Sequence, residues 1–202
     1  MLYVVFAIVG YFFGCIQSSY ILGRLKGIDI RQHGSKNAGA SNAFMTMGVK
    51  YGVLVALIDI LKAAIPVFLI RIFFKDSDIL ATVCGFFAVM GHVFPAFMGF
   101  RGGKGTASIY GLLLGLNPLI AVFAGIAIIA GSFASNYIAI GTLVMHIVAI
   151  ILLLIYDYPI WIIVIYLLLF VMSMLKHMEN FVKIHKGEET KLMDAIKDKT
   201  KS

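Results

Sequence analysis

Charged residues are scarce in this sequence. Of its 202 residues, only 13% are Asp, Glu, Lys or Arg, whereas 61% are hydrophobic. A water-soluble domain typically has about 25% charged and about 45–50% apolar residues. No soluble fold of this length can bury so much apolar surface, so lipid must be the solvent for most of the chain. The sequence therefore predicts an all-α integral membrane protein.

The chain also lacks the features of several other protein classes. Its two cysteines lie in apolar runs, and no cysteine or histidine has metal-ligand spacing. No serine lies in the nucleophile elbow of a soluble hydrolase. The net charge of +7 is carried in short gaps between apolar runs, without a basic stripe that alternates with aromatics. We therefore expect no metal, cofactor or nucleic-acid partner, but an anionic membrane face or anionic substrates.

Five apolar runs approach the ~20 residues that cross the hydrocarbon of a bilayer. They cover residues 2–22, 52–74, 79–98, 137–156 and 160–175. The apolar stretch at residues 105–135 is ambiguous. It is either one long tilted helix or two short helices broken at Asn117-Pro118, and a re-entrant pair is a further alternative.

Basic residues decide how often the ambiguous stretch crosses, because cytoplasmic segments carry an excess of Lys and Arg. The loop after the first run has five basic residues, Arg101 and Lys104 follow the third run, and the tail has seven. If all three groups are cytoplasmic, residues 105–135 must cross twice. This predicts seven transmembrane helices with the N-terminus outside and the C-terminus cytoplasmic, and it leaves Arg71 and Lys75 outside. We expect one membrane domain at residues 1–189 and a charged cytoplasmic tail at residues 190–202.

Three polar clusters interrupt the apolar background on the predicted cytoplasmic face. The first, residues 34–42 (GSKNAGASN), combines small residues with Ser and Asn donors and the charge of Lys36. Small residues allow backbone N–H groups to approach an anion closely. The segment is therefore a candidate anion-binding loop, with a flexible polar linker as the alternative.

The second cluster, residues 91–106 (GHVFPAFMGFRGGKGT), ends at the start of a predicted helix. Helix N-terminal amides attract phosphate, and Arg101 and Lys104 add positive charge. The segment is not a Walker A loop, because Gly105 follows Lys104 where Ser or Thr is required. The alternative is a basic membrane anchor with a glycine hinge.

The third cluster, residues 176–183 (KHMENFVK), is followed by Gly187-Glu188-Glu189. On a helix, His177, Asn180 and roughly Lys183 or Ile184 share one face, so an imidazole, an amide and an ammonium can contact one ligand. A solvated helix end beside the membrane is the alternative.

Two further candidate sites lie inside predicted spans, the first formed by Asp59 and Lys62 and the second by His146. Asp59 and Lys62 are three residues apart, so their side chains can pair. Intramembrane charges are costly, so this pair marks either a functional site or a buried structural ion pair. For His146, a hydrogen-bonded structural role is favoured over a proton relay.

In this order the three clusters resemble the motifs of the bacterial acyl-phosphate-dependent glycerol-3-phosphate acyltransferases. The resemblance extends from the first span to Glu189. It implies seven spans in the bacterial plasma membrane, with the N-terminus outside and the active site on the cytoplasmic face. It also implies that an acyl chain passes from acyl phosphate to the sn-1 hydroxyl of glycerol 3-phosphate, in contact with membrane lipid. The products are lysophosphatidate and phosphate, for phospholipid synthesis.

The resemblance implies roles for individual residues. It gives catalytic roles to Lys104, His177 and Asn180, of which the last two order the substrate. The implied substrate-binding residues are Ser35, Lys36, Asn37, Asn42, Gly102, Gly103, Lys183 and Glu189. Within this set, phosphate oxygens are expected against Ser35, Asn37 and Lys104. Lys183 is expected to add charge, and Glu189 to orient a donor.

Four positions depart from the family's usual pattern. Met45 and Lys183 stand where Arg is usual, Lys36 where Gly is usual, and Gln17 where Pro is usual. Arg clamps phosphate with two donors whereas Lys is a point charge, so Lys36 is a candidate to restore the charge that Met45 lacks. One alternative function is that of a diverged paralogue with weak activity or another phosphorylated acceptor. The other is a non-enzymatic membrane binder or transporter of organic phosphates.

Overall fold

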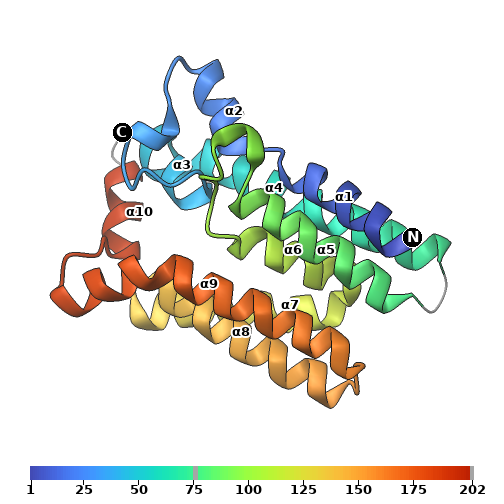
Figure 1. The fold of residues 1–202 in the computed structure, drawn as a ribbon. Helices are drawn as coiled ribbons and strands as arrows, with labels where there is room; N and C mark the ends of the chain where they lie inside the picture. Colours follow the sequence, from blue (N-terminus) through green and yellow to red (C-terminus); the bar gives the residue numbers. More distant parts are fainter. Residues whose placement is uncertain (75–76, 201–202) are drawn as a thin grey trace. The chain divides into compact units, whose positions relative to one another are not determined.

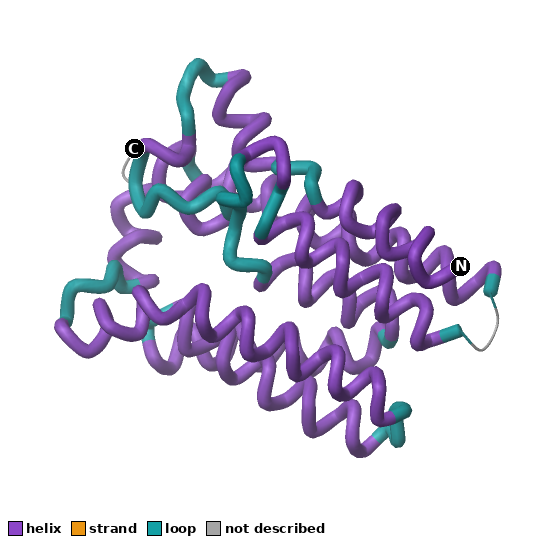
Figure 2. The backbone as a smooth tube through the Cα atoms, viewed as in Figure 1, coloured by secondary structure: helices purple, strands orange, loops and turns teal. Residues whose placement is uncertain are grey.

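The computed structural model describes residues 1–74 and 77–200, and this part of the chain contains helices and no strand (Figure 2). Lys75 and Lys201, two of the basic residues that entered the topology prediction, lie outside the described residues. The chain divides into two compact units, Met1–Leu116 and Asn117–Ser202. We call them the first and second units and describe each by itself.

The described part of the first unit contains six α-helices and two short 3₁₀ helices, and the α-helices are labelled in Figure 1. In chain order they are α1 (Leu2–Gly14), α2 (Ser18–Leu25), η1 (Ile30–Gln32), α3 (Ala40–Met47), α4 (Val49–Phe73), α5 (Asp78–Val93), η2 (Ala96–Met98) and α6 (Thr106–Leu116). Helix α1 packs along α5, and α4 packs along α3, α5 and α6. The first predicted span is therefore interrupted, because α1 ends at Gly14 and α2 begins at Ser18.

Glycines allow the backbones of α1 and α5 to touch. Gly10 and Gly14 have the GxxxG spacing that favours close helix packing in membranes. A Cβ on Gly14 would contact the backbone oxygen of Ala88 on α5, and a Cβ on Gly91 would contact that of Tyr11 on α1. The end of α5, where the second motif begins, is therefore fixed directly against α1.

The ambiguous stretch at residues 105–135 contains two helices, α6 and α7 (Pro118–Ser135), broken at Asn117. The Asn117 Oδ1 atom accepts the backbone N–H groups of Leu119 and Ile120 at 3.0 and 3.3 Å, and Pro118 occupies the first turn. An N-cap followed by proline starts a new helix for a local reason. Helix α6 has 11 residues, so it is only roughly 16 Å long.

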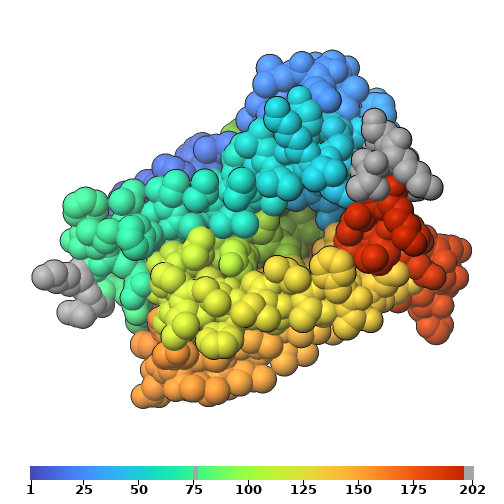
Figure 3. Space-filling model, turned by 180° about the vertical axis from the view of Figure 1, so that it is seen from behind, coloured from blue at the N-terminus to red at the C-terminus, as the bar shows by residue number. Residues whose placement is uncertain are grey.

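The second unit contains α7, α8 (Ile138–Ile155), α9 (Ile160–Lys186) and α10 (Leu192–Thr200). Helices α7 and α8 lie side by side, as their yellow and orange side chains show in Figure 3, and α9 packs on α8. Helix α10 is attached to the unit through Asn136, which accepts the N–H groups of Leu192 and Met193 at 2.8 and 2.9 Å. Part of the predicted tail is therefore helical and tied to the turn between α7 and α8.

The outer surfaces of the long helices are apolar. Leu57 is 51% exposed, Ile126 58% and Trp161 66%. Among the residues that the structure describes, six helical segments are long and apolar enough to cross a membrane, with α1 and α2 forming one of them, and α6 is a shorter apolar helix. The chain is an all-α integral membrane protein whose apolar side chains face lipid and whose buried positions include polar groups.

Candidate active site

The first motif is held in shape by one buried amide. Asn42 lies in α3, and its Nδ2 group donates to the backbone oxygens of Ile30, His33 and Asn37 at 2.9–3.0 Å. Its Oδ1 atom accepts the backbone N–H of Ser35 at 2.9 Å. The sequence prediction placed Asn42 against substrate, but its side chain is enclosed and its polar groups bind the loop. Asn42 therefore fixes the backbone of Ser35 and Asn37 through its buried side chain.

Ser35 and Lys36 project from this loop, and Asn37 is half-buried. Lys36 has a φ of 59°, in the left-handed region. A residue with a side chain is disfavoured in that conformation by roughly 1 kcal/mol relative to glycine. This strain gives a physical reason for the glycine that the acyltransferase motif usually has at this position.

The loop of the second motif follows α5 and folds back onto the C-terminal end of that helix. Two backbone hydrogen bonds hold it there. The N–H of Gly102 donates to the carbonyl of Val93, and the N–H of Gly103 to that of His92, both at 3.1 Å. A side chain on Gly102 would contact the His92 carbonyl oxygen, and one on Gly103 would contact the His92 ring. Close approach therefore requires both glycines, and it fixes the backbone that presents Lys104.

The first two motifs meet at one end of the first unit. A Cβ on Gly103 would lie 2.8 Å from the backbone oxygen of Ala38, so the two loops are in contact. Lys104 is half-buried two residues before α6 begins. The amides at a helix N-terminus attract anions, and the lysine charge adds to that attraction. The structure therefore brings the loops that carry the predicted phosphate-binding residues of these two motifs into contact.

A buried charged network supports the second motif. The Nζ atom of Lys62 donates to Asp59 Oδ1 at 2.8 Å and to the Ile16 carbonyl at 2.7 Å, and it lies 2.8 Å from His92 Nδ1. Asp59 and Lys62 thus form a buried ion pair, one of the two alternatives that the sequence left open. Because an ammonium only donates, His92 Nδ1 accepts, and a neutral ring carries its proton on Nε2. That nitrogen faces Gly103.

Polar residues at the break between α1 and α2 complete the network. The Ser18 hydroxyl donates to Asp59 Oδ1 at 2.9 Å. The Gln17 Nε2 group donates to the His92 carbonyl at 3.0 Å and lies 3.4 Å from that of Gly91. Gln17 therefore ties the helix break to the start of the second motif. Sequence analysis missed this role, although three successive polar residues interrupt the first apolar run here.

In the second unit, the third motif lies near the C-terminal end of α9. His177 is buried, and its Nδ1 atom lies 2.8 Å from the Ser173 carbonyl. This carbonyl can only accept, so Nδ1 carries the proton and Nε2 of a neutral ring is an acceptor. The Asn180 Nδ2 group donates to Glu189 Oε1 at 2.6 Å, after the chain turns at Gly187 with a φ of 73°. Glu189 therefore orients the Asn180 amide.

Two further residues of the second unit are engaged in other contacts. The Nζ atom of Lys183 donates to Glu179 at 2.6 Å on an exposed surface, where an ion pair contributes little to stability. His146 is fully buried, with its Nδ1 atom 3.1 Å from the Tyr166 hydroxyl and its ring 5.4 Å from that of Phe170. This enclosed position favours the structural role of His146 over a proton relay.

Known proteins resemble this chain over nearly its whole length. The sequence model of the family described as glycerol-3-phosphate acyltransferase matches residues 4–187. Glycerol-3-phosphate acyltransferase 1 of Oceanobacillus iheyensis is 41% identical over 199 residues, which cover 95% of this chain and 96% of that protein. The glycerol-3-phosphate acyltransferase of Halalkalibacterium halodurans is 37% identical over 188 residues, with coverage of 90% and 91%.

The fold is similar to two crystal structures of PlsY (YgiH), an integral membrane glycerol 3-phosphate acyltransferase. The glycerol 3-phosphate form has a TM-score of 0.89 and 30% identity, and the match covers 94% of both chains. The lysophosphatidic acid form has a TM-score of 0.88 and 28% identity, with coverage of 96% of this chain and 98% of that one.

The buried network generates a stability prediction. In Lys62→Met the Asp59 carboxylate loses its cation in an apolar interior, which typically costs roughly 3–5 kcal/mol. We expect a large fall in the melting temperature of the detergent-solubilised protein. The double variant Asp59→Asn/Lys62→Met should recover part of the loss, because it removes both charges. Equal melting temperatures of Lys62→Met and wild type would show that the pair does not stabilise the fold.

Proposed function

The chain belongs to the glycerol-3-phosphate acyltransferase family, and from this premise we propose that its acyl donor is acyl phosphate. Its activity is the acylation of glycerol 3-phosphate in phospholipid synthesis. The acyl chain passes to the sn-1 hydroxyl, and the products are lysophosphatidate and phosphate; acyl-CoA and acyl carrier protein are not direct donors. The TM-score of 0.89 to the glycerol 3-phosphate form of PlsY carries the acceptor, and the three ordered motifs support acyl phosphate as the donor.

Acyl phosphate is an activated mixed anhydride, so the enzyme has mainly to position two anions and to stabilise developing charge. The hydroxyl oxygen of glycerol 3-phosphate attacks the acyl carbon, and the bond from that carbon to the phosphate oxygen breaks. The hydroxyl proton passes to the departing phosphate. The chemistry therefore demands a well-formed anion site more than a strong side-chain base.

Residues of the first unit provide this anion site in the proposal. Lys104 and the N-terminal amides of α6 stabilise a phosphate group, and Ser35 and Asn37 bind further phosphate oxygens. Gly102 and Gly103 keep the backbone accessible to the ligand. The contact between the Ala38 carbonyl and Gly103 supports this assignment, because it places the two loops at the same end of the unit.

Residues of the second unit order the substrate in the proposal. The Nε2 atom of His177 accepts a hydrogen bond from a substrate hydroxyl, since its Nδ1 proton is directed to Ser173. Asn180, whose amide is oriented by Glu189, is the second group of this unit that orders the substrate. Lys183 adds positive charge while its ammonium is bound to Glu179.

A second candidate is a variant of this reaction with weaker activity or another phosphorylated acceptor. Met45 favours it, because this half-exposed α3 residue has no hydrogen-bond donor where Arg is usual. A charge-assisted hydrogen bond is roughly twice as strong as a neutral one, so its loss weakens phosphate binding. Lys36, on the loop before α3, is the candidate that compensates. The rate with glycerol 3-phosphate as acceptor separates the two candidates.

The proposed topology has seven crossings in the bacterial plasma membrane, with the N-terminus outside and the active site on the cytoplasmic face. The division at Asn117 and the basic residues beside the first and second motifs support it. Helix α6 is the seventh crossing, in addition to the six longer segments. Its roughly 16 Å length requires neighbouring helices to shelter it. In this arrangement residues 1–189 form the catalytic domain and residues 190–202 a cytoplasmic tail.

Purified protein is expected to transfer acyl groups from acyl phosphate to glycerol 3-phosphate, and not from acyl-CoA. Lys104→Ala should lower the turnover by about 10²–10³, the usual cost of losing one preorganised charge-stabilising donor. Lys104→Arg should restore only part of the rate, because a planar guanidinium does not replace a compact ammonium. Wild-type turnover in Lys104→Ala would exclude the proposed role of this lysine.

On α9 the chain offers a matched pair of histidines. We expect His177→Ala and Asn180→Ala to impair turnover strongly, because they remove groups that order the substrate. His185→Ala should have little effect, since His185 lies on the same helix but is exposed. Rates are measured together with melting temperatures, so that loss of structure is recognised. Equal losses from His177→Ala and His185→Ala would contradict the assignment.

Reporter fusions test the orientation of the chain. A fusion at the C-terminus should report the cytoplasm, and a fusion at the N-terminus should report the outside, because an odd number of crossings separates them. If both ends lie on the same face, α6 and α7 do not cross separately.

A further inference from the structure

Glu189 lies in the short connection between α9 and α10 in the second unit (Figure 1). Its Oε1 atom accepts the Asn180 amide at 2.6 Å, and this contact orients the Asn180 side chain. The connection is fixed to α9 at one end, where the chain turns at Gly187 and the Glu188 N–H donates to the Lys183 carbonyl at 2.8 Å. The orientation of the Glu189 carboxylate therefore depends on what holds the other end, at the start of α10.

The start of α10 is held by the turn between α7 and α8. The first N–H groups of a helix have no partner inside the helix and need acceptors from elsewhere. For α10, the Asn136 backbone oxygen accepts the Leu192 N–H at 2.8 Å, and Asn136 Oδ1 accepts the Met193 N–H at 2.9 Å. Asparagine is among the most effective residues for capping a helix N-terminus. Asn136 therefore caps α10, although it lies 57 residues before Met193 in the sequence.

The turn that carries Asn136 is itself fixed. The Ser135 hydroxyl donates to the Gly131 carbonyl at 2.6 Å and accepts the Tyr137 N–H at 3.2 Å. Asn136 has a φ of 67°, in the left-handed region that asparagine enters more readily than most residues. Helices α7 and α8 pack along each other on either side of this turn. The cap therefore ties α10 to a well-ordered part of the second unit.

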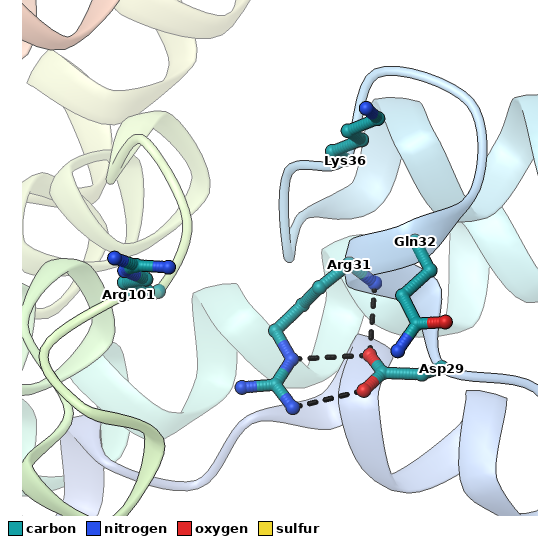
Figure 4. Close-up of a pocket in the computed structure, with 6 residues that line it drawn as sticks. Asp29, Arg31, Gln32, Lys36 and Arg101 are labelled. Carbon is teal, nitrogen blue, oxygen red and sulfur yellow. Dashed lines mark hydrogen bonds and ion pairs between the residues drawn. The ribbon is translucent and has the colours of Figure 1, made fainter.

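A cap from a distant segment differs from the local pairing beside the first motif. There, the Arg31 guanidinium binds the Asp29 carboxylate through two hydrogen bonds, at 3.0 and 2.8 Å (Figure 4). These two residues are close in the chain, so their pairing orders only its own loop. The cap joins Asn136 to the segment that follows the third motif, so it fixes one part of the second unit against another.

We propose that Asn136 is a positioning residue of the acyltransferase, which holds Glu189, and through it the Asn180 amide, by capping α10. The inference rests on the proposed function for the role of Asn180 in ordering the substrate. Glu189 lies between two fixed points, the turn at Gly187 and the capped Leu192. Without the cap the connection is held at one end only, so the Glu189 carboxylate orients the amide less well. Helix α10 is then a working part of the enzyme and not only a charged tail.

Asn136→Ala tests the cap. It removes the Oδ1 acceptor of Met193 and keeps the backbone oxygen that binds Leu192. Replacing a capping asparagine by alanine typically shifts a helix equilibrium roughly fivefold. We expect amide hydrogen exchange in α10 to become faster by about this factor and the turnover to fall roughly two- to fivefold. Ala195→Pro, which breaks α10 itself, should lower the turnover further.

Two more variants show whether the loss comes from the cap. Asn136→Asp keeps a side-chain oxygen in the same place, and a negative charge is favourable at a helix N-terminus, so exchange and turnover should both stay close to wild type. Asp157→Ala is the matched control for backbone strain. Asp157 is an exposed left-handed residue with a φ of 52°, in the turn at the other end of α8. Its replacement should leave the exchange of α10 and the turnover unchanged.

Exchange and turnover together decide the proposal. It is overturned if Asn136→Ala leaves the exchange of α10 unchanged, because the cap then holds nothing. It is also overturned if Ala195→Pro releases α10 while the turnover stays at the wild-type value, or if Asp157→Ala loses as much turnover as Asn136→Ala. The exchange measurement needs no substrate. If the wild type transfers no acyl group while α10 is released in Asn136→Ala and held in Asn136→Asp, the proposed function fails and the cap stands.

Discussion

The ammonium of Lys62 has to be satisfied inside an apolar helical unit, and the rest of the first unit is arranged around this requirement. Its three donor positions meet the Asp59 carboxylate, the Ile16 carbonyl and His92 Nδ1. These partners come from α4, from the break between α1 and α2, and from α5. A buried charge without partners is strongly unfavourable, so the network fixes the relative positions of these elements. The break in the first predicted span is thus part of the network.

The same network connects packing to the chemistry of phosphate. His92 is held by Lys62 on one side and stands against Gly103 on the other, and its carbonyl accepts the N–H of Gly103. A glycine-rich loop is flexible by itself, but here it is fixed to the end of α5. Preorganised donors stabilise developing charge without reorganising during the reaction. The buried ion pair therefore holds in place, through His92, the loop that carries Lys104 of the proposed site.

The first and third motifs are ordered by polar contacts of the same kind. Asn42 uses its whole amide to shape the loop that carries Ser35, and Glu189 fixes the amide of Asn180. In each motif one polar residue orients another, which the proposed function places against the ligand. A list of motif residues does not distinguish these two roles, because Asn, Glu and His can fill either of them.

The sequence alone determined the membrane class, the family and the helix break at Asn117, which has a local cause. Apolar run length and scarce charge require lipid, Asn117-Pro118 is a local N-cap, and three ordered motifs identify the acyltransferases. Only the tertiary structure decided that Asn42 supports its loop, that Gln17 binds the end of α5, and that Asn136 holds α10. These facts depend on contacts between residues distant in sequence, which hydrophobic periodicity and motif spacing do not encode.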